Sequence, residues 1–179
     1  MPFALSVKSV NASAGAIMSL WDHVSVFEDS PSMHALDYPP HITFAIYDAP
    51  EVSKEMAIAA IEKAAQGRRS IEITFNRIRT FDGPSLILWA DPEPKEVLLE
   101  MHRKIHSAIS PEFCRTHYRR GWMPHCTLAT RTAPCRNPDA PAFAAAFRGG
   151  IHVAFDVVDC VALQPLQVVA EAPLNAPGI

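Results

Sequence analysis

A short motif occurs twice in this chain, and its repetition constrains the fold more than any other feature of the sequence. Residues 39–45 read PPHITFA and residues 123–129 read MPHCTLA, so both follow the pattern Pro-His-x-Thr-apolar-Ala. The two copies lie 84 positions apart, and the same offset pairs the Ala-Pro at 49–50 with the Ala-Pro at 133–134. One His-x-Thr has little meaning by itself, whereas two copies with matched flanks indicate an internal duplication.

Each copy predicts a β-strand whose start is marked by a proline. Successive side chains of a strand point to opposite faces, so His41 and Thr43 share one face while their apolar neighbours anchor the strand in a core. The second copy repeats this pattern. We therefore expect strands over about residues 41–47 and 125–130. The polar side chains that we expect to face a cleft are His41, Thr43, His125 and Thr127.

Two histidines and two hydroxyl groups around one cleft suit phosphoryl chemistry. A neutral imidazole can take a proton from an attacking water or hydroxyl, and an imidazolium can give a proton to the leaving oxygen. Histidine titrates near pH ~6.5, so both roles are accessible at neutral pH. The threonine hydroxyls can hydrogen-bond the non-bridging phosphate oxygens. A single histidine on a strand is more often a structural hydrogen-bonding group, but the repeat at fixed spacing favours function, and this arrangement requires no metal.

The paired motifs resemble those of the 2H phosphoesterase superfamily, which includes 2′-5′ RNA ligase-like proteins and 2′,3′-cyclic nucleotide phosphodiesterases. That family carries two His-x-Thr/Ser motifs in a chain of about this size. The resemblance implies a phosphoesterase that needs no metal or cofactor and acts on a 2′,3′-cyclic phosphate or a 2′-5′ phosphodiester of a nucleotide or RNA end. It also implies that His41, Thr43, His125 and Thr127 are catalytic. RNA ligation is the reverse of this reaction and stays open.

The N-terminus departs from the family pattern. Many relatives carry a basic residue just before the first strand, whereas residues 1–3 here read MPF and the nearest basic residue is Lys8. Substrate contacts that the family makes with its N-terminus are therefore not transferred to this chain.

The hydrophobic patterns of the whole chain predict an α+β fold. We interpret residues 1–179 as a single bilobal domain, with two pseudo-symmetric lobes that enclose a central cleft. Each lobe is an antiparallel-rich sheet with outer helices, and the fold implied by the family resemblance agrees. Strands are expected near residues 2–7, 41–47, 70–81, 85–90, 125–130 and from 151 onward, and helices near 17–28, 51–66, 94–109 and 139–147.

Four further residues are candidates for substrate binding: Tyr38, Arg119, Arg120 and Trp122. Tyr38, just before the first motif, can stack on a base or pack in the core. The two arginines belong to a locally basic stretch that can neutralise a phosphate, although a solvated loop is an equal alternative. Trp122 can pack beneath His125 or stack on a base.

The composition of the chain limits which binding partners and which cellular compartment are expected. The chain has 179 residues and a formal net charge of −3, which argues against binding long nucleic acid by many phosphates and fits a nucleotide or a short RNA end. The four cysteines show no C-x-x-C spacing, and we see neither a secretory signal nor a run of about 18 apolar residues. We therefore expect a cytoplasmic monomer with reduced thiols and no contact with a membrane.

Two other classes of function stay open at this point. A nucleotide-binding module without turnover would have the same four motif residues, although binding alone does not require both histidines. A metallohydrolase would need a cluster of ligands, and no acidic residues gather near either motif. His102 and His106 have a spacing that can bind zinc, but Arg103 stands where the metalloprotease pattern requires Glu. We predict that these two histidines lie on a solvated helix face.

Overall fold

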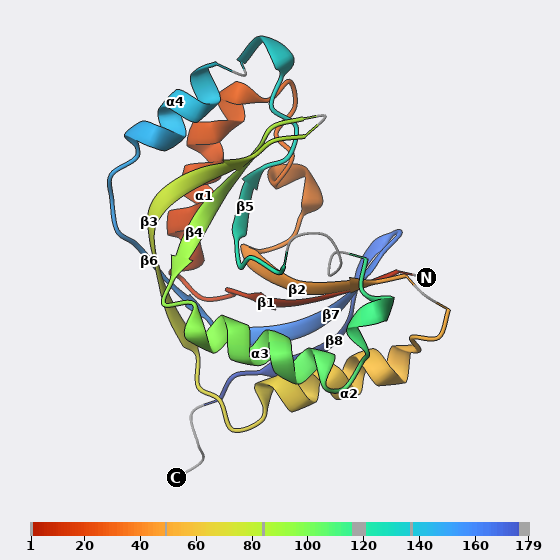
Figure 1. Ribbon diagram of the computed structural model, residues 1–179. Helices are drawn as coiled ribbons and strands as arrows, with labels where there is room; N and C mark the ends of the chain where they lie inside the picture. The colour runs from red at the N-terminus through yellow and green to blue at the C-terminus, as the bar shows by residue number, and fades with distance from the viewer. Residues whose placement is uncertain (1, 49, 84, 116–120, 137, 176–179) are drawn as a thin grey trace.

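The computed structural model describes residues 2–48, 50–83, 85–115, 121–136 and 138–175, and confirms the α+β class (Figure 1). The strands are β1 (Phe3–Lys8), β2 (His41–Tyr47), β3 (Ile71–Phe81), β4 (Ile87–Glu93), β5 (Cys126–Ala129), β6 (Ile151–Phe155), β7 (Val157–Leu163) and β8 (Leu166–Pro173). The α-helices are α1 (Ala14–Val24), α2 (Lys54–Ala65), α3 (Glu96–His106) and α4 (Asp139–Ala146). None of the described helices is long and apolar enough to cross a membrane.

The eight strands form one curled antiparallel sheet in the order β6-β3-β4-β5-β2-β1-β7-β8. The two motif strands are neighbours at its centre, where β2 and β5 pair through a single register position, Ile42 opposite Cys126. The half-sheets of the two predicted lobes, β6-β3-β4-β5 and β2-β1-β7-β8, therefore join through the motif strands. This junction fixes the position of one motif relative to the other.

The duplication seen in the motifs extends to the order of the elements. When the chain is shifted by 84 positions, β1 falls on β4, α1 on α3, β2 on β5, α2 on α4 and β3 on β7. The sheet nevertheless mixes the two repeats, because β3 pairs with β4 and β7 pairs with β1. Each half-sheet thus contains strands from both repeats, so the two repeats are interleaved within one sheet.

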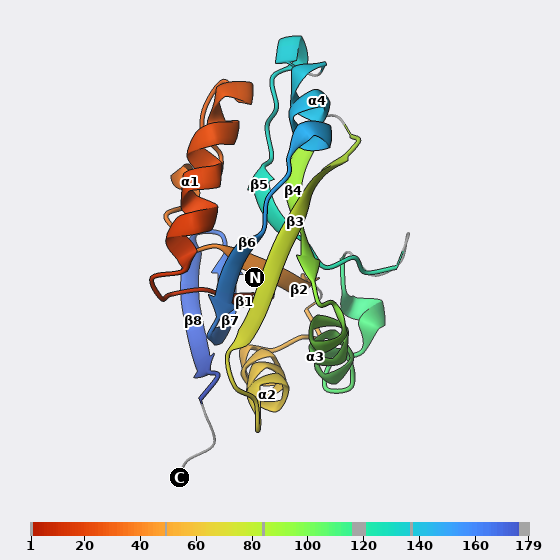
Figure 2. The same cartoon turned by 90° about the vertical axis from the view of Figure 1, so that its left-hand side faces the viewer.

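The helices lie outside the sheet (Figures 1 and 2). Helix α2 packs on β7, β8 and α3, whereas α1 packs on β5 and β6 and α4 on β3. Helix α1 packs on the sheet because one of its faces is apolar. The buried residues recur at helical spacing: Ile17, Leu20, Trp21 and Val24. In α2 the hydroxyl of Ser53 accepts a hydrogen bond from the backbone N–H of Met56 and caps the helix.

Candidate active site

The four motif side chains meet around the junction of β2 and β5. Ile42 and Cys126 are register partners with no exposed surface, so they share the core side of the sheet. Their neighbours in sequence point to the other side, which we call the motif face. Because the strands are antiparallel, the residue before one partner lies beside the residue after the other. The structure therefore brings two side-by-side pairs together: His41 with Thr127, and Thr43 with His125.

The two imidazole rings are held in the same way. Nδ1 of His41 donates a hydrogen bond of 2.9 Å to the carbonyl oxygen of Pro39, and Nδ1 of His125 donates one of 2.8 Å to the carbonyl oxygen of Met123. A carbonyl oxygen only accepts hydrogen bonds, so Nδ1 carries the proton in both neutral rings. Nε2 is then the nitrogen that gains or loses a proton, and both rings are set up for acid/base chemistry at that atom.

The surroundings lower the pKa of both histidines. Burial is the main cause for each ring, because it disfavours the charged imidazolium, while the hydrogen bond to the backbone carbonyl acts in the opposite direction. For His41 the charges of His125 and Lys8 lower the pKa further.

A β-bulge follows each motif threonine. Thr43 is the register partner of Ser6 and Ala45 that of Leu5, so Phe44 is an extra residue in β2. The second motif repeats this irregularity: Thr127 pairs with Trp89 and Ala129 pairs with Leu88. Bulges bend a strand and change the direction of nearby side chains, and they are common next to active sites. The equivalent bulges give both motif strands the same local shape.

Each motif threonine has a distinct neighbour on the motif face. The hydroxyls of Thr43 and Ser6 share a hydrogen bond of 3.3 Å, although Ser6 is buried. Beside Thr127 lies Trp89, whose ring contacts the His125 ring edge-on at a centroid distance of 5.9 Å and stacks on Phe81. Ser6 and Phe81 could not be predicted from the sequence alone, because only the register across β1–β2 and β3–β4 places them at the site.

Lys8 is a further residue that lies next to the site. It is the register partner of His41 at the end of β1 and is only 3% exposed. Its ammonium forms ion pairs with the buried carboxylate of Asp159 at 2.9 Å and with Glu171 at 2.6 Å. Burial lowers the pKa of Lys8, but these carboxylates outweigh it and raise the pKa overall. A lysine therefore stays charged beside His41. In the sequence, the one sign of this charge is a basic residue in the first strand.

The predicted substrate-binding residues have different surroundings. Tyr38 is buried, donates a hydrogen bond of 2.5 Å to Asp159 and places its ring edge-on to His41 at 4.8 Å. Trp122 donates a hydrogen bond of 3.1 Å from its indole N–H to the carbonyl oxygen of Thr43. Both contacts are structural, and a contact of either residue with a substrate stays a prediction. Arg119 and Arg120 lie outside the described residues.

The prediction that His102 and His106 lie on a solvated face is wrong. His102 is only 9% exposed and its ring stacks on Trp122 at 4.3 Å with an interplanar angle of 8°. The two histidines share a hydrogen bond of 3.0 Å, and His106 also bonds the hydroxyl of Tyr47 at 2.9 Å. The segment before the second motif and β2 pack over this face of α3, which helical periodicity cannot reveal. No three His, Cys, Asp or Glu side chains in the described ranges group closely enough to hold a metal ion.

The chain is similar to proteins of one family and to several solved structures. The sequence profile of the 2′-5′ RNA ligase superfamily matches residues 16–163. Among solved structures, TT0787 of Thermus thermophilus is similar, with a TM-score of 0.67, 16% identity, and coverage of 99% of this chain and 100% of that one. The E. coli LigT complexed with 3′-AMP gives a TM-score of 0.66 at 15% identity, and covers 98% of this chain and 100% of its own.

A more distant likeness is to Kluyveromyces marxianus Usb1 with uridine monophosphate, with a TM-score of 0.53, 9% identity and coverage of 98% of this chain and 97% of that one. At these identities the likeness shows the fold alone. None of the curated proteins matches the chain.

The fold is that of the 2H phosphoesterases, and the profile match shows that the chain belongs to the 2′-5′ RNA ligase superfamily. Membership of this superfamily supports an activity of the phosphoesterase or ligase type.

Proposed function

We propose that this chain is a metal-independent phosphoesterase that opens a 2′,3′-cyclic phosphate, or a 2′-5′ phosphodiester, at a nucleotide or RNA end. The observation that carries the proposal is the matched pair of rings. His41 and His125 flank one junction of strands, and each has its Nδ1–H bonded to the carbonyl oxygen two residues earlier. Each ring therefore exchanges protons at Nε2, as a base and an acid acting on the two sides of one phosphate must do.

We assign His41 as the general base and His125 as the general acid for hydrolysis. The cation of Lys8 beside His41 favours the neutral ring, which is the form that accepts a proton. Nε2 of His41 takes a proton from water as the water oxygen bonds to phosphorus. Nε2–H of His125 gives its proton to the ribose oxygen as the phosphorus–oxygen bond breaks. In ligation the two roles are exchanged.

The threonines stabilise the charge on the phosphate. The hydroxyls of Thr43 and Thr127 lie on the motif face beside the histidines and can donate to the non-bridging oxygens as charge redistributes in the transition state. The bond between Ser6 and Thr43 orients one of these hydroxyls. LigT complexed with 3′-AMP and Usb1 with uridine monophosphate are nucleotide complexes of proteins with this fold, which supports a nucleotide as the substrate.

The test is turnover of a nucleoside 2′,3′-cyclic phosphate and of a 2′-5′ dinucleotide in the presence of a chelator. The variants His41→Asn and His125→Asn should each lose about 10²–10⁴-fold in kcat while keeping the fold. His23→Asn, at an exposed position of α1, is the matched control and should keep full activity. The position of the surviving phosphate, 2′ or 3′, identifies the oxygen that is protonated.

Near-normal activity in either motif variant would contradict the proposed mechanism. Activity that disappears in the chelator and returns with a divalent metal would favour a metallohydrolase. Binding of nucleotide by the wild type without any product, from these substrates or from longer RNA ends, would favour a binding module.

A further inference from the structure

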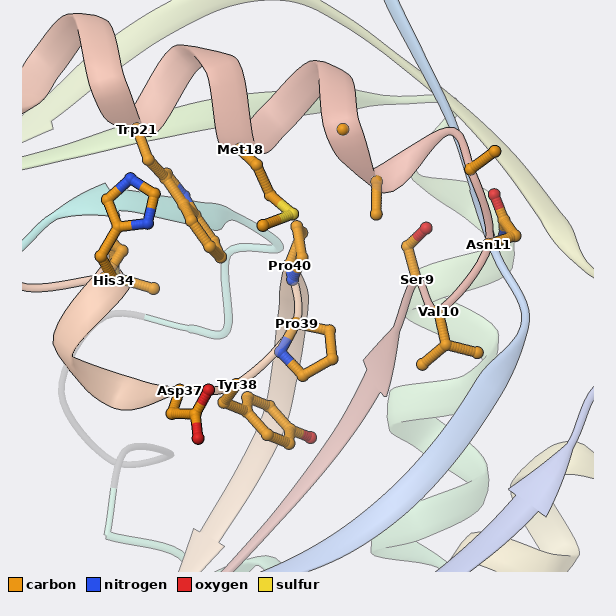
Figure 3. A pocket seen from close by; sticks show the side chains of 14 residues that line it. Ser9, Val10, Asn11, Met18, Trp21, His34, Asp37, Tyr38, Pro39 and Pro40 are labelled. Atoms are coloured by element: carbon orange, nitrogen blue, oxygen red, sulfur yellow. The ribbon is translucent and has the colours of Figure 1, made fainter.

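A pocket of about 560 Å³ opens between α1 and the segment that precedes the first motif (Figure 3). Binding sites for small molecules typically have volumes of ~300–1,000 Å³ and mostly apolar walls with a few polar groups. The walls here fit that description. Met18 and Trp21 come from α1, Val10 from the turn before it, and Pro39 and Pro40 from the chain that enters β2.

The pocket adjoins the site of the first histidine. Pro39, which lines the pocket, is the residue whose carbonyl oxygen accepts the hydrogen bond from His41. Tyr38 also lines the pocket, and its ring touches the His41 ring edge-on. A group in the pocket would therefore lie next to the residues that hold His41 in place.

One buried polar group in the pocket has no partner. Ser9 lines the pocket and is 0% exposed, and its hydroxyl has no hydrogen-bond partner in the described part of the protein. Such a hydroxyl costs free energy unless a ligand or a water completes its hydrogen bonding. By contrast, the amide of Asn11 is already occupied, because it bonds Ala154 and Ser13. Ser9 is thus the buried wall group whose hydrogen bonding a ligand can complete, and Asp37 and His34 also line the pocket.

The pocket also exposes apolar surface to solvent. Val10 is 54% exposed and Met18 is 43% exposed, and both line the pocket. Gly15 lines the same space from the first turn of α1, and a Cβ at that position would meet no atom within 4 Å. The helix therefore has room for a ligand at the place where any other residue would project a side chain.

We propose that this pocket holds the nucleobase of the nucleotide whose phosphate lies at the two motif histidines. The inference rests on the proposed function and adds a specific subsite to it. Proline rings and a thioether pack well on the faces of a flat heteroaromatic ring, and a single hydroxyl can pair with its polar edge. No lysine or arginine stands among the described residues that line the pocket, so it is not a second phosphate site.

The test fills the pocket from its open side. Gly15→Leu places an isobutyl group in the empty space, and Ala16→Leu is the matched control, because it adds a similar bulk one position away, where the helix does not line this pocket. The ligands are the four common nucleoside 2′,3′-cyclic phosphates and methyl riboside 2′,3′-cyclic phosphate, which has no base. Calorimetry with nucleoside 3′-monophosphates and with methyl phosphate gives a readout that does not depend on turnover.

We expect Gly15→Leu to raise KM for the nucleoside substrates by about tenfold or more, the size of effect that a lost pocket contact produces, and to leave kcat within about twofold. The Kd of the 3′-monophosphates should rise in parallel, whereas the base-free ligands and the Ala16→Leu variant should be unaffected.

Two results would overturn the inference. One is that Gly15→Leu leaves the affinity for nucleotides unchanged. The other is that it weakens base-free and nucleoside ligands equally, which would place the effect at the phosphate. Failure of the proposed function has a different signature, namely turnover that persists without the motif histidines.

Discussion

Each motif histidine is positioned by its own local backbone. The carbonyl group two residues earlier accepts the Nδ1–H of the ring, so the tautomer is set before any substrate binds. Each ring is partly buried, and burial lowers the pKa of both histidines. The repeat thus produces two similar acid/base groups, and their differences come from what lies around them.

The lowered pKa values predict an acidic optimum for kcat/KM. Activity should rise with pH as the base, His41, loses its proton, and fall as the acid, His125, loses its own. Because the pKa of each ring lies below its ordinary value of about 6.5, the maximum of the bell-shaped profile should lie below about pH 6.5. A profile measured over the full range checks this, and a maximum above neutral pH would contradict it.

The ion pairs of Lys8 connect stability with catalysis. Lys8→Met would leave the buried carboxylate of Asp159 without its cation, which should cost about 3–5 kcal/mol in the free energy of unfolding. The same change removes a positive charge beside His41, so the pKa of that ring should rise and the acidic limb of the pH profile should move to higher pH. Denaturant unfolding and the pH profile measure the two effects.

Lys63→Met, at an exposed position of α2, is the control for Lys8→Met and should change neither quantity. An acidic limb that stays in place in Lys8→Met would show that His41 does not sense this charge.

At the level of elements, a chain of side-chain contacts ties the segment before the second motif to the first motif strand. The indole of Trp122 bonds the backbone of Thr43 and stacks on His102, which bonds His106, which in turn bonds Tyr47 at the end of β2. These contacts add to the single register pair between β2 and β5. They hold the approach to His125 against the strand that carries His41.

Variants of Trp122 separate the two parts of this connection. Trp122→Phe keeps a ring on His102 and loses the hydrogen bond to Thr43, so it should cost about 0.5–1.5 kcal/mol in the free energy of unfolding. Trp122→Ala loses both and should cost about 3 kcal/mol. Thermal and denaturant unfolding measure these values. If the alanine variant is no less stable than the phenylalanine variant, the stacking on His102 does not stabilise the fold.

The sequence alone predicts the local part of this site and little of the rest. The motif face follows from period-2 alternation, which is a property of each strand by itself, so His41 and His125 can be found without a structure. Lys8, Ser6 and Phe81 reach the site only through the register of strands that are distant in sequence. The environment of His102 was wrongly predicted for the same reason, because the residues that cover it come from other parts of the chain.

At the level of the whole molecule, the two repeats exchange strands. β3 of the first repeat pairs with β4 of the second, and β7 of the second pairs with β1 of the first. The family fold and the order of elements could be predicted from the duplicated motif, since matched flanks imply matched elements. The exchange of strands could not be predicted, because it depends on which strand of one repeat pairs with which strand of the other.

The exchange of strands predicts the behaviour of a split protein. When the chain is divided between Asp82 and Gly83, the first fragment keeps β3 without β4, and the second keeps β7 without β1. Neither fragment should fold cooperatively alone, whereas the two together should reassemble. Circular dichroism and unfolding curves of each fragment and of the mixture test this. Cooperative unfolding of either isolated fragment would show that the repeats are independent.

The measurement that tests the central claim most directly is a double-mutant cycle on the two motif histidines. It compares kcat/KM of the wild type, His41→Asn, His125→Asn and the double variant on one nucleoside 2′,3′-cyclic phosphate. Residues that act as one catalytic unit are non-additive, so the double variant should be about as slow as the slower single variant. Losses that multiply fully in the double variant would show that the two histidines act independently, and the paired mechanism would be wrong.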